Sequence, residues 1–222
     1  MADDDERDQD PISGLSSLND PVRRRLYEYV GTRDEPVARD DAATAVGISR
    51  TLAAYHLDKL ADVGLLATSY ARAAGRGGPG AGRPAKRYVR AQEELSVSVP
   101  PRDYGLLAGV LAEAMSADDS GAVRQAVTAA ARAAGRAASG PDLSVALRAC
   151  GYEPATTGDG TVELRNCPFH QVARRHTEVV CGLNLHLVQG LLEGSGQSPA
   201  RAVLAPRPGH CCVRVLGPHD RP

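Results

Sequence analysis

The sequence predicts an α+β protein in three parts: a helix-turn-helix with a β-hairpin, a helical linker and a small C-terminal α+β domain. Three observations support this. Two short helical patterns meet at Gly47, and two strand-like runs, 65–70 and 86–89, flank a glycine-rich segment. Helical patterns rich in alanine and leucine then precede short strands and four of the five cysteines. A chain of 222 residues is long enough for two domains or one extended domain with a buried core.

The first 20 residues are strongly acidic. They contain seven Asp or Glu against one Arg, a net charge of −6, and few apolar side chains. Such a segment buries too little apolar surface to offset the entropy lost on folding, so we predict a disordered acidic tail over residues 1–17. The N-terminus lacks the features of a secretory signal, and no apolar run approaches the roughly 18 residues of a membrane span. We therefore expect a cytoplasmic protein.

Three helices are predicted between residues 20 and 62. Asp20 followed by Pro21 is a strong helix start, a capping residue and then proline at the first position. A short helix over residues 40–46 is expected to end at Gly47, which can take the positive φ of a helix stop. Ser49 is placed to cap a longer helix. The buried face of that helix is predicted from residues at i, i+4, i+7 and i+11, namely Ala53, Leu57, Leu60 and Gly64.

The exposed start of this longer helix is polar, aromatic and basic. Thr51, Tyr55 and Asp58 project away from the buried face, and Asp58 and Asp62 come late in the helix. The second helix of a helix-turn-helix presents its N-terminal residues to base edges in the major groove of DNA. We therefore predict that the DNA contacts of this helix come from Ser49, Arg50, Thr51, Tyr55, His56 and Lys59. For His56, a structural role is the alternative to a phosphate contact.

Residues 65–70 and 86–89 are predicted to pair as a hairpin with a long glycine-rich tip. Its basic side chains are placed to reach phosphates or a narrow minor groove, namely Arg72, Arg76, Arg83, Lys86 and Arg87. Residues 21–91 carry 13 Lys or Arg against seven Asp or Glu, a net charge of +6. We therefore predict a winged helix over residues 18–91 that binds double-stranded DNA. The alternative is a winged helix used only for protein contacts.

Residues 21–90 resemble the winged-helix domain of ArsR-like bacterial transcriptional regulators. The similarity lies in HLDKL at 56–60 and GLL at 64–66, and in GRPAKRY at 82–88, which leads out of the hairpin. The resemblance implies a winged helix-turn-helix fold with a DNA operator as its partner.

Two helices are predicted in residues 102–137. The first, 103–115, has apolar residues at helical spacing, namely Leu106, Leu107, Val110, Leu111 and Ala114, and the second, 121–134, is rich in alanine. Small and aliphatic side chains at this spacing permit close helix packing. In winged-helix regulators such helices commonly build a dimer, and two half-sites on DNA favour a two-fold partner. We therefore expect a homodimer by analogy of fold, and packing within the monomer is the alternative.

Residues 141–217 are predicted to form a small α+β sensor domain. A short helix over 142–150 ends at Gly151, and residues 152–156 and 162–165 form a hairpin around a GDG turn. Residues 167–216 hold four of the five cysteines and four of the six histidines. An odd number of cysteines in a cytoplasmic protein favours free thiols or metal ligands over a disulfide framework. Cys150, on the short helix, is expected to belong to the core.

The spacing of the cysteines limits how they can meet. A single helix from Pro168 would place Cys181 about 20 Å from Cys167, so co-ligation requires a helix break, which Thr177 as a cap followed by Glu178 predicts. Cys211 and Cys212 are predicted to open a strand, in which successive side chains face opposite sides. We therefore choose Cys211 as the ligand beside Cys167 and Cys181, with Cys212 as its substitute. The candidates for a fourth position are Cys212, His170, His176 and His210.

Soft thiolate ligands suit zinc and iron-sulphur clusters alike. The segments CPFH at 167–170, VCGLN at 180–184 and PGHCCV at 208–213 resemble the C-terminal region of actinobacterial SufR-like repressors, which control iron-sulphur cluster assembly and carry a cluster. The resemblance spans about residues 18–216 and implies a 2Fe-2S or 4Fe-4S cluster held by Cys167, Cys181 and Cys211. Cyanobacterial members have four well-separated cysteines, whereas the last position here is an adjacent pair, which leaves the cluster type and the fourth ligand open.

These patterns predict a dimeric transcriptional regulator, a repressor that senses iron or redox state through its cluster. A zinc site, for which Cys167 and His170 form a Cys-x2-His pair, is one alternative. A sensor of a small organic ligand, with the cysteines filling the core, is another. An enzyme that uses a cysteine with His170 or His176 as base is not expected, because no nucleophile motif accompanies them.

Overall fold

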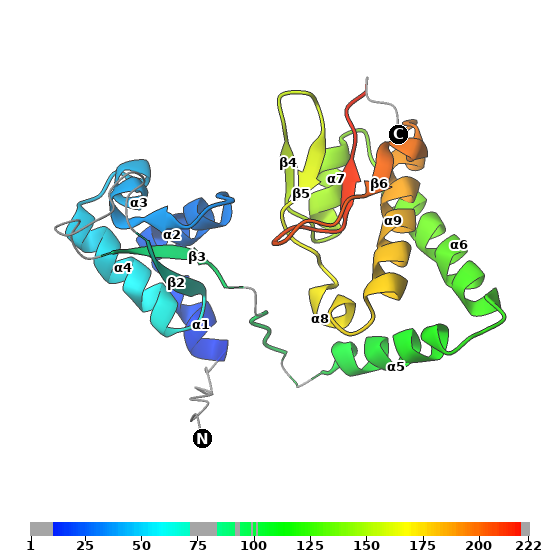
Figure 1. The fold of residues 1–222 in the computed structure, drawn as a ribbon, viewed down its shortest axis with the longest axis horizontal. Helices are drawn as coiled ribbons and strands as arrows, with labels where there is room; N and C mark the ends of the chain where they lie inside the picture. The colour runs from blue at the N-terminus through cyan, green and yellow to red at the C-terminus, as the bar shows by residue number, and fades with distance from the viewer. Residues whose placement is uncertain (1–10, 72–83, 92–93, 99, 101, 219–222) are drawn as a thin grey trace. The chain divides into compact units, whose positions relative to one another are not determined.

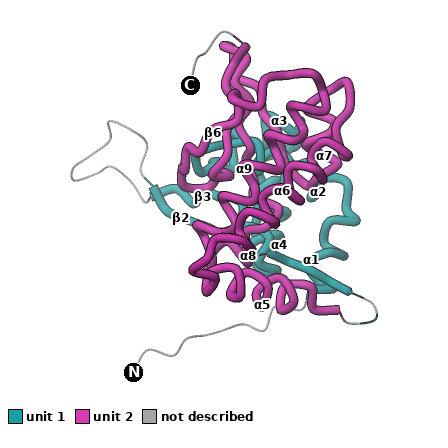
Figure 2. Tube along the Cα trace, turned by 90° about the vertical axis from the view of Figure 1, so that its right-hand side faces the viewer, with its two compact units in different colours: residues 1–101 teal, residues 102–222 magenta. Residues whose placement is uncertain are grey.

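The computed structural model describes residues 11–71, 84–91, 94–98, 100 and 102–218. The chain folds into two compact units, residues 1–101 and 102–222, each with its own hydrophobic core (Figure 2). The helical linker and the sensor domain predicted from the sequence lie in the same unit. None of the helices in the described part of the chain combines the length and the apolar character that crossing a membrane requires.

The helices of the first unit begin and end close to where the sequence predicts. The Asp20 side chain accepts hydrogen bonds from the first backbone N–H groups of α2 (Pro21–Gly31). Helix α3 (Arg39–Val46) ends at Gly47, which has a φ of 72°. Helix α4 (Arg50–Asp62) begins after Ser49, whose side chain accepts a hydrogen bond from the backbone N–H of Leu52 at 3.2 Å. The predicted helix-turn-helix is therefore present as α3 and α4 (Figure 1).

The core of the first unit lies between α2, α3, α4 and the sheet beside them. Leu26, Ala53, Leu57, Leu60 and Tyr88 are fully buried there. The prediction that Gly64 extends the buried face of α4 is wrong. This glycine follows the helix with a φ of 76°, and the backbone N–H of the next residue bonds back to the carbonyl of Leu60, so Gly64 ends the helix instead.

Helix α1 (Pro11–Ser17) lies where the sequence predicts part of a disordered tail. Gly14 and Ser17 are buried, and the Leu95 side chain lies so close to Gly14 that a Cβ atom there would clash with it. The prediction is wrong for residues 11–17 because a segment some 80 positions along the chain covers this helix. Residues 1–10 of the predicted tail lie outside the described residues.

The sheet of the first unit is antiparallel, with strand order β1-β3-β2. Strands β2 (Leu66–Ala71) and β3 (Ala85–Arg90) form the predicted hairpin, with Leu66 opposite Arg90. Strand β1 (Val37–Ala38) pairs with β3 at Tyr88. It was not predicted, because a strand of two residues is too short to show an alternating pattern of apolar and polar side chains. The tip of the hairpin, residues 72–83, lies outside the described residues.

The second unit is built on the contact between α6 (Ala122–Ala137) and α9 (Thr177–Gly194), which lie side by side (Figure 1). A Cβ atom at Gly135 would lie 2.1 Å from the carbonyl oxygen of Leu187, and one at Gly190 would lie 2.1 Å from that of Arg132. The two helices therefore approach backbone to backbone, which only glycine allows at these positions. Glu193 at the end of α9 binds Arg132 and Arg136 of α6.

A second antiparallel sheet, with strand order β4-β5-β7-β6, lies with the short helix α7 (Leu143–Ala149) against the buried face of α9. Strands β4 (Pro154–Thr156) and β5 (Val162–Leu164) form the predicted hairpin. Strand β7 (Val213–Val215) pairs with β5 and with β6 (Ala202–Leu204), which follows the 3-10 turn η1 (Pro199–Arg201) and was not predicted. Asp142 caps α7, and Gly151 follows that helix with a φ of 86°.

Helix α5 (Tyr104–Ser116) presents most of its large apolar side chains to solvent. Its buried residues, Ala112 and Met115, pack with Val179 of α9 and with Val172 of α8 (His170–Ala173). The opposite side is exposed by 57–73% at each of Tyr104, Leu106, Leu107, Val110 and Leu111. The apolar residues that the sequence places at helical spacing on this helix are therefore not used inside the described chain.

Candidate nucleic-acid interface and candidate metal centre

The exposed face of α4, with its cap, carries five of the six residues that the sequence predicts to contact DNA from this helix. Ser49, Arg50, Thr51, Tyr55 and Lys59 are all exposed, and 57% of the Tyr55 surface is accessible. The Ser49 hydroxyl also caps the helix, so this side chain has a structural role in addition. The exposed face is accessible over about two turns, the length that a recognition helix presents to a major groove.

A hollow of about 420 Å³ lies beside this helix start. It is lined by the first residues of α3 and α4 and by both strands of the hairpin, namely Ala38, Arg39, Asp40, Arg50, Tyr70, Pro84, Ala85 and Lys86. Arg50, which is predicted to read a base, lines this hollow. Its Nε lies 2.6 Å from the Asp40 carboxylate, and both side chains are about two-thirds exposed. Three basic side chains around a polar hollow suit a phosphate group.

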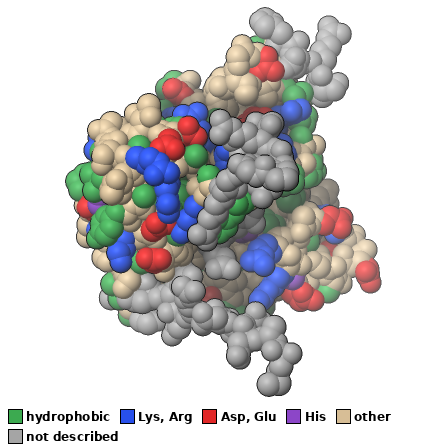
Figure 3. All heavy atoms as spheres, turned by 60° about the vertical axis from the view of Figure 1, so that its left-hand side comes forward, with side chains coloured by type: hydrophobic (Ala, Val, Ile, Leu, Met, Phe, Trp, Pro, Cys, Tyr) green, Lys and Arg blue, Asp and Glu red, His purple; other side chains and the backbone are tan. Residues whose placement is uncertain are grey.

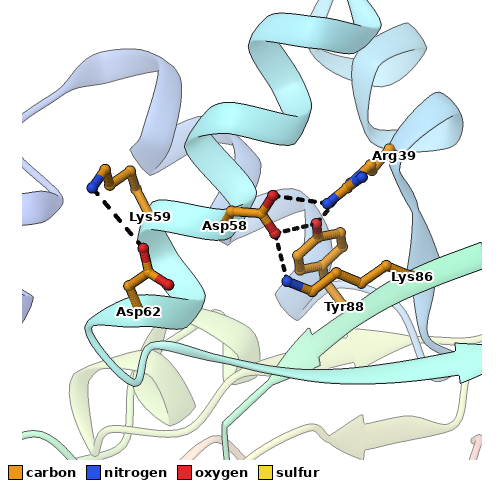
Figure 4. Close-up of polar contacts among 6 residues, drawn as sticks. All are labelled: Arg39, Asp58, Lys59, Asp62, Lys86 and Tyr88. Atoms are coloured by element: carbon orange, nitrogen blue, oxygen red, sulfur yellow. Dashed lines mark hydrogen bonds and ion pairs between the residues drawn. The ribbon is translucent and has the colours of Figure 1, made fainter.

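Asp58 is the centre of a polar network that joins α4 to α3 and to the hairpin (Figure 4). Its carboxylate accepts hydrogen bonds from Lys86 Nζ at 2.7 Å, from the Tyr88 hydroxyl at 2.7 Å and from Arg39 Nη2 at 2.8 Å. Arg39 also donates to the Tyr88 hydroxyl at 2.8 Å. This carboxylate therefore fixes the angle between the recognition helix and strand β3.

The electrostatics of the network follow from its charges. Burial raises the pKa of Asp58, but the hydrogen bonds from Lys86 and Tyr88 and the charge of Arg39 outweigh it, so the pKa lies below its ordinary value. Burial and the hydrogen bond to Asp58 raise the pKa of Tyr88 to about 12. At neutral pH the carboxylate is therefore ionised and the phenol keeps the proton it donates.

Several predicted DNA contacts have other roles or lie outside the described residues. Lys86 is bound to Asp58, and Arg87 Nη1 donates to the carbonyl of Pro36 at 3.1 Å, so both are held within the unit. His56 is only 8% exposed and belongs to the interior, which supports the structural alternative and not the phosphate contact. Arg72, Arg76 and Arg83 lie outside the described residues.

On the face of the molecule drawn in Figure 3, the charged side chains are mixed in sign. Figure 3 shows Lys and Arg side chains with Asp and Glu set among them, instead of one uniform basic patch. The pairs of Arg50 with Asp40 and of Lys59 with Asp62 are examples on the recognition helix. Contact with DNA would therefore require some basic side chains to leave acidic partners, which lowers the net gain from each.

In the second unit, cysteine side chains from three separate elements meet beside Tyr152. Cys167 lies between β5 and α8, Cys181 lies on α9, and Cys211 and Cys212 precede β7. In each of the pairs Cys167–Cys211, Cys211–Cys212 and Cys181–Cys212, one thiol lies close enough to act on the pKa of the other. Cys211 is buried and the other three are half-buried. The four thiols are therefore neighbours, and we call them the thiol cluster.

The choice of Cys211 over Cys212 assumed a strand that begins at Cys211, which is two residues too early. Strand β7 starts at Val213, and the chain bends at Cys212. The alternation of a regular strand therefore does not apply to this pair. The Nδ2 of Asn184 lies 3.0 Å from the Cys211 sulphur and 3.9 Å from the Cys212 sulphur, so both thiols face the same point on α9.

The predicted break before α9 is present, with α8 ending at Ala173 and α9 beginning at Thr177. Thr177 is not the cap, however. Its hydroxyl donates to the carbonyl of Ala173 at 2.7 Å, and His176 is the residue at the cap position, without a side-chain bond to the helix. The break brings Cys181 onto the buried side of α9, three residues before Asn184 and thus on the same face.

The surroundings of Cys167, Cys181 and Cys211 raise the pKa of each of these thiols. The contact with Cys211, followed by burial, raises the pKa of Cys167, and burial raises that of Cys181. The neighbouring Cys167 thiol lowers the pKa of Cys211, but the Cys212 thiol and burial outweigh this effect, so the pKa of Cys211 is raised. The backbone N–H of Val213 donates to the sulphur of Cys211 at 3.5 Å.

The histidines considered as a fourth ligand have contacts elsewhere. His176 pairs with Glu113 at 3.8 Å, and His210 bonds to Arg207 and to the carbonyl of Pro208. His170 begins α8 and is half-buried, and its backbone N–H donates to the carbonyl of Cys167 at 3.1 Å. Among the described residues, no three His, Cys, Asp or Glu side chains are arranged to hold a single metal ion.

Reasoning from the sequence missed Arg39, Tyr88, Tyr152 and Asn184. Asn184 had a usable signal, because a polar residue within the apolar pattern of α9 and three positions after a cysteine faces the same side as that cysteine. Arg39 and Tyr88 had none, because their partner Asp58 was assigned to the exposed side of α4.

Comparison with known proteins identifies part of the first unit. A family model described as a helix-turn-helix domain matches residues 18–69, which include α2, α3, α4 and part of β2. No curated protein and no solved structure matches the chain. Together with the hairpin that follows α4, the match supports a DNA-binding helix-turn-helix regulator of the winged-helix type.

The Asp58 network gives a test of the first unit. Asp58→Asn should lower its free energy of unfolding by about 1–2 kcal/mol, because charged hydrogen bonds are lost from a carboxylate that is more than one-third exposed and therefore partly screened. The pKa of Asp58 is depressed, so its contribution is full above pH ~4 and is lost as the pH falls through the folded-state pKa. The difference between wild type and variant in urea unfolding should therefore shrink below pH ~4. Asp62→Asn, which removes only an exposed pair at 4.0 Å, should change stability little.

Proposed function

We propose that this chain is a homodimeric transcriptional repressor that binds an iron-sulphur cluster in its C-terminal unit and thereby senses iron or redox state. The observation that carries the proposal is the thiol cluster, in which cysteines from three elements meet in a unit joined to a helix-turn-helix. The donor set is all sulphur, and it is enclosed by apolar side chains and approached by N–H donors, as iron-sulphur clusters require.

The proposed ligands are Cys167, Cys181, Cys211 and Cys212. Contacts among these thiols favour Cys212 over His170, His176 or His210 as the fourth ligand. When bound, the cluster would supply positive iron centres that stabilise thiolates and a charge that changes with oxidation. The chain would contribute the enclosure of these thiolates and the N–H groups that bond to them.

The proposed dimer uses the exposed face of α5. Five large apolar side chains on 13 residues form a stripe that a second copy of the chain would cover. Each would contribute about 1.5–3 kcal/mol if fully buried. Two-fold symmetry also suits a helix-turn-helix, whose operators repeat in two half-sites.

The same helix gives a route from sensor to operator. The other side of α5 packs on α8 and α9, next to the chain that carries Cys167 and Cys181. A change in the thiol cluster would shift α8 and α9, and with them the angle of α5 in the dimer. DNA affinity would change by the difference in cluster stability between the two arrangements of recognition helices.

The metal content tests the first part of this proposal. Protein purified without oxygen should contain iron and inorganic sulphide, with broad visible absorbance that bleaches in air. Cys181→Ser should lose that absorbance, whereas Cys150→Ser, which removes a cysteine outside the thiol cluster, should retain it. A colourless wild-type protein that contains zinc would replace the cluster with a zinc site. A wild-type protein with neither metal after anaerobic reconstitution would favour the sensor of a small organic ligand.

DNA recognition is tested at Arg50. If Arg50 reads a base, Arg50→Ala should lose about 1–3 kcal/mol of discrimination at one operator position, measured by titration of matched and substituted duplexes. Asp40→Asn is the matched variant, because it frees Arg50 and removes a negative charge from the same hollow, so it should bind DNA at least as tightly as wild type. An equal loss on every sequence for Arg50→Ala would mean that Arg50 contacts phosphate.

The dimer is tested on α5. Leu107→Glu with Leu111→Glu places two charges in the proposed interface and should give a monomer in light scattering after size-exclusion chromatography. Its affinity for a two-site operator should fall toward that for a half-site. Glu113→Gln, on the same helix and 76% exposed, should remain dimeric. A monomeric wild-type protein at micromolar concentration would contradict the proposed dimer.

A further inference from the structure

The side chain of Asn184 is fully buried on the face of α9 that meets the sheet. Its Nδ2 donates to the Cys211 sulphur at 3.0 Å and approaches the Cys212 sulphur at 3.9 Å. Its Oδ1 accepts a hydrogen bond from the hydroxyl of Tyr152, which is 2% exposed. The amide is therefore held with its oxygen toward the phenol and its N–H groups toward the thiol cluster.

A buried amide is stable only when its polar atoms have good partners. Neutral thiols are weak acceptors of hydrogen bonds, whereas anionic sulphur accepts much stronger, charge-assisted bonds. The strong acceptor on Asn184, its oxygen, is matched by a strong donor in Tyr152. Among the residues that the structure describes, the donor side is matched only by sulphur atoms, so the hydrogen bonds of this amide are strongest when those sulphurs carry negative charge.

Tyr152 fixes the direction of the amide. Burial, and then the nearby cysteines, raises the pKa of its phenol, so this hydroxyl keeps its proton and remains a donor over the whole working range of pH. Rotation of the Asn184 amide by half a turn would set its NH₂ group against that donor and its oxygen against the sulphurs. The pair Tyr152–Asn184 therefore allows one orientation.

We infer that Asn184, oriented by Tyr152, is a positioning residue that stabilises negative charge on Cys211 and Cys212 when these cysteines bind a metal centre, an inference that rests on the proposed function. Bonds from N–H groups to ligand sulphur favour the more negative state of an iron-sulphur centre and so raise its reduction potential. For a single ion they favour binding of the thiolate ligands. The Tyr152–Asn184 pair would set the reduction potential, or the metal concentration, at which the sensor responds.

The test uses Asn184→Leu, which keeps the branching and the number of heavy atoms of the side chain and removes the donor, and Tyr152→Phe, which keeps the ring and releases the amide. After anaerobic reconstitution with ferrous iron and sulphide, the midpoint potential should shift to a more negative value in Asn184→Leu and by a smaller amount in Tyr152→Phe. With cobalt(II) alone, the affinity read from the thiolate-to-cobalt absorption bands should fall about 10- to 100-fold in Asn184→Leu.

Val188→Ala is the matched control, because Val188 is fully buried one turn further along the same face of α9 and bonds to no sulphur. It should lower stability but leave the potential and the cobalt affinity unchanged. If Asn184→Leu behaves like Val188→Ala, the inference is overturned while the metal-binding proposal stands. If wild-type protein takes up neither the cluster nor cobalt, both are overturned.

Discussion

The second unit depends on the contact of two helix backbones. Helices α6 and α9 approach so closely at Gly135 and Gly190 that a methyl group at either position would overlap a carbonyl of the other helix. This contact fixes the rotation of α9 about its own axis. With one side of α9 held against α6, the side that carries Cys181 and Asn184 faces the sheet and the two cysteines before β7. The geometry of the thiol cluster thus depends on Gly135 and Gly190, two residues without reactive side chains.

The first unit depends in a similar way on a group that never needs to touch DNA. Asp58 lies on the recognition helix, but its carboxylate binds Arg39, Lys86 and Tyr88 and thereby ties that helix to the hairpin. An acidic residue on a helix that faces a polyanion would ordinarily repel it. Its charge is compensated by two cations within the unit, so it stabilises the binding surface without opposing the phosphates.

The helices of the first unit were predictable because their ends have local causes. Asp20, Ser49 and Gly47 each act within three residues of the chain, and reasoning from sequence reads such caps well. The same reasoning failed at α1 and β1. Helix α1 is covered by Leu95, and β1 exists because β3 lies beside it, and neither cause is visible in the local sequence.

The candidate sites show the same difference between features with a local cause, which could be predicted, and contacts between distant segments, which could not. That Cys167, Cys181 and Cys211 come together was predicted from spacing and from the expected break at Thr177. Cys212 was only one of four candidates for the fourth position, because the prediction assumed a regular strand where the chain bends. Partners that are distant in sequence, such as Tyr152 with Asn184 and Asp58 with Arg39, were beyond reach, since pairing between separate elements leaves no period in the sequence.

The position of Cys211 and Cys212 in the sheet has a mechanical consequence. The backbone N–H of Cys211 donates to the carbonyl of Leu164 at the end of β5, and the carbonyl of Cys212 accepts from Ala205 just after β6. The two residues whose sulphurs face α9 therefore also carry main-chain bonds to both neighbouring strands. Any force that a ligand exerts on these sulphurs is transmitted within one residue to the middle of the sheet. Cys211 and Cys212 therefore connect the sheet, through their main chain, to α9, through their sulphurs.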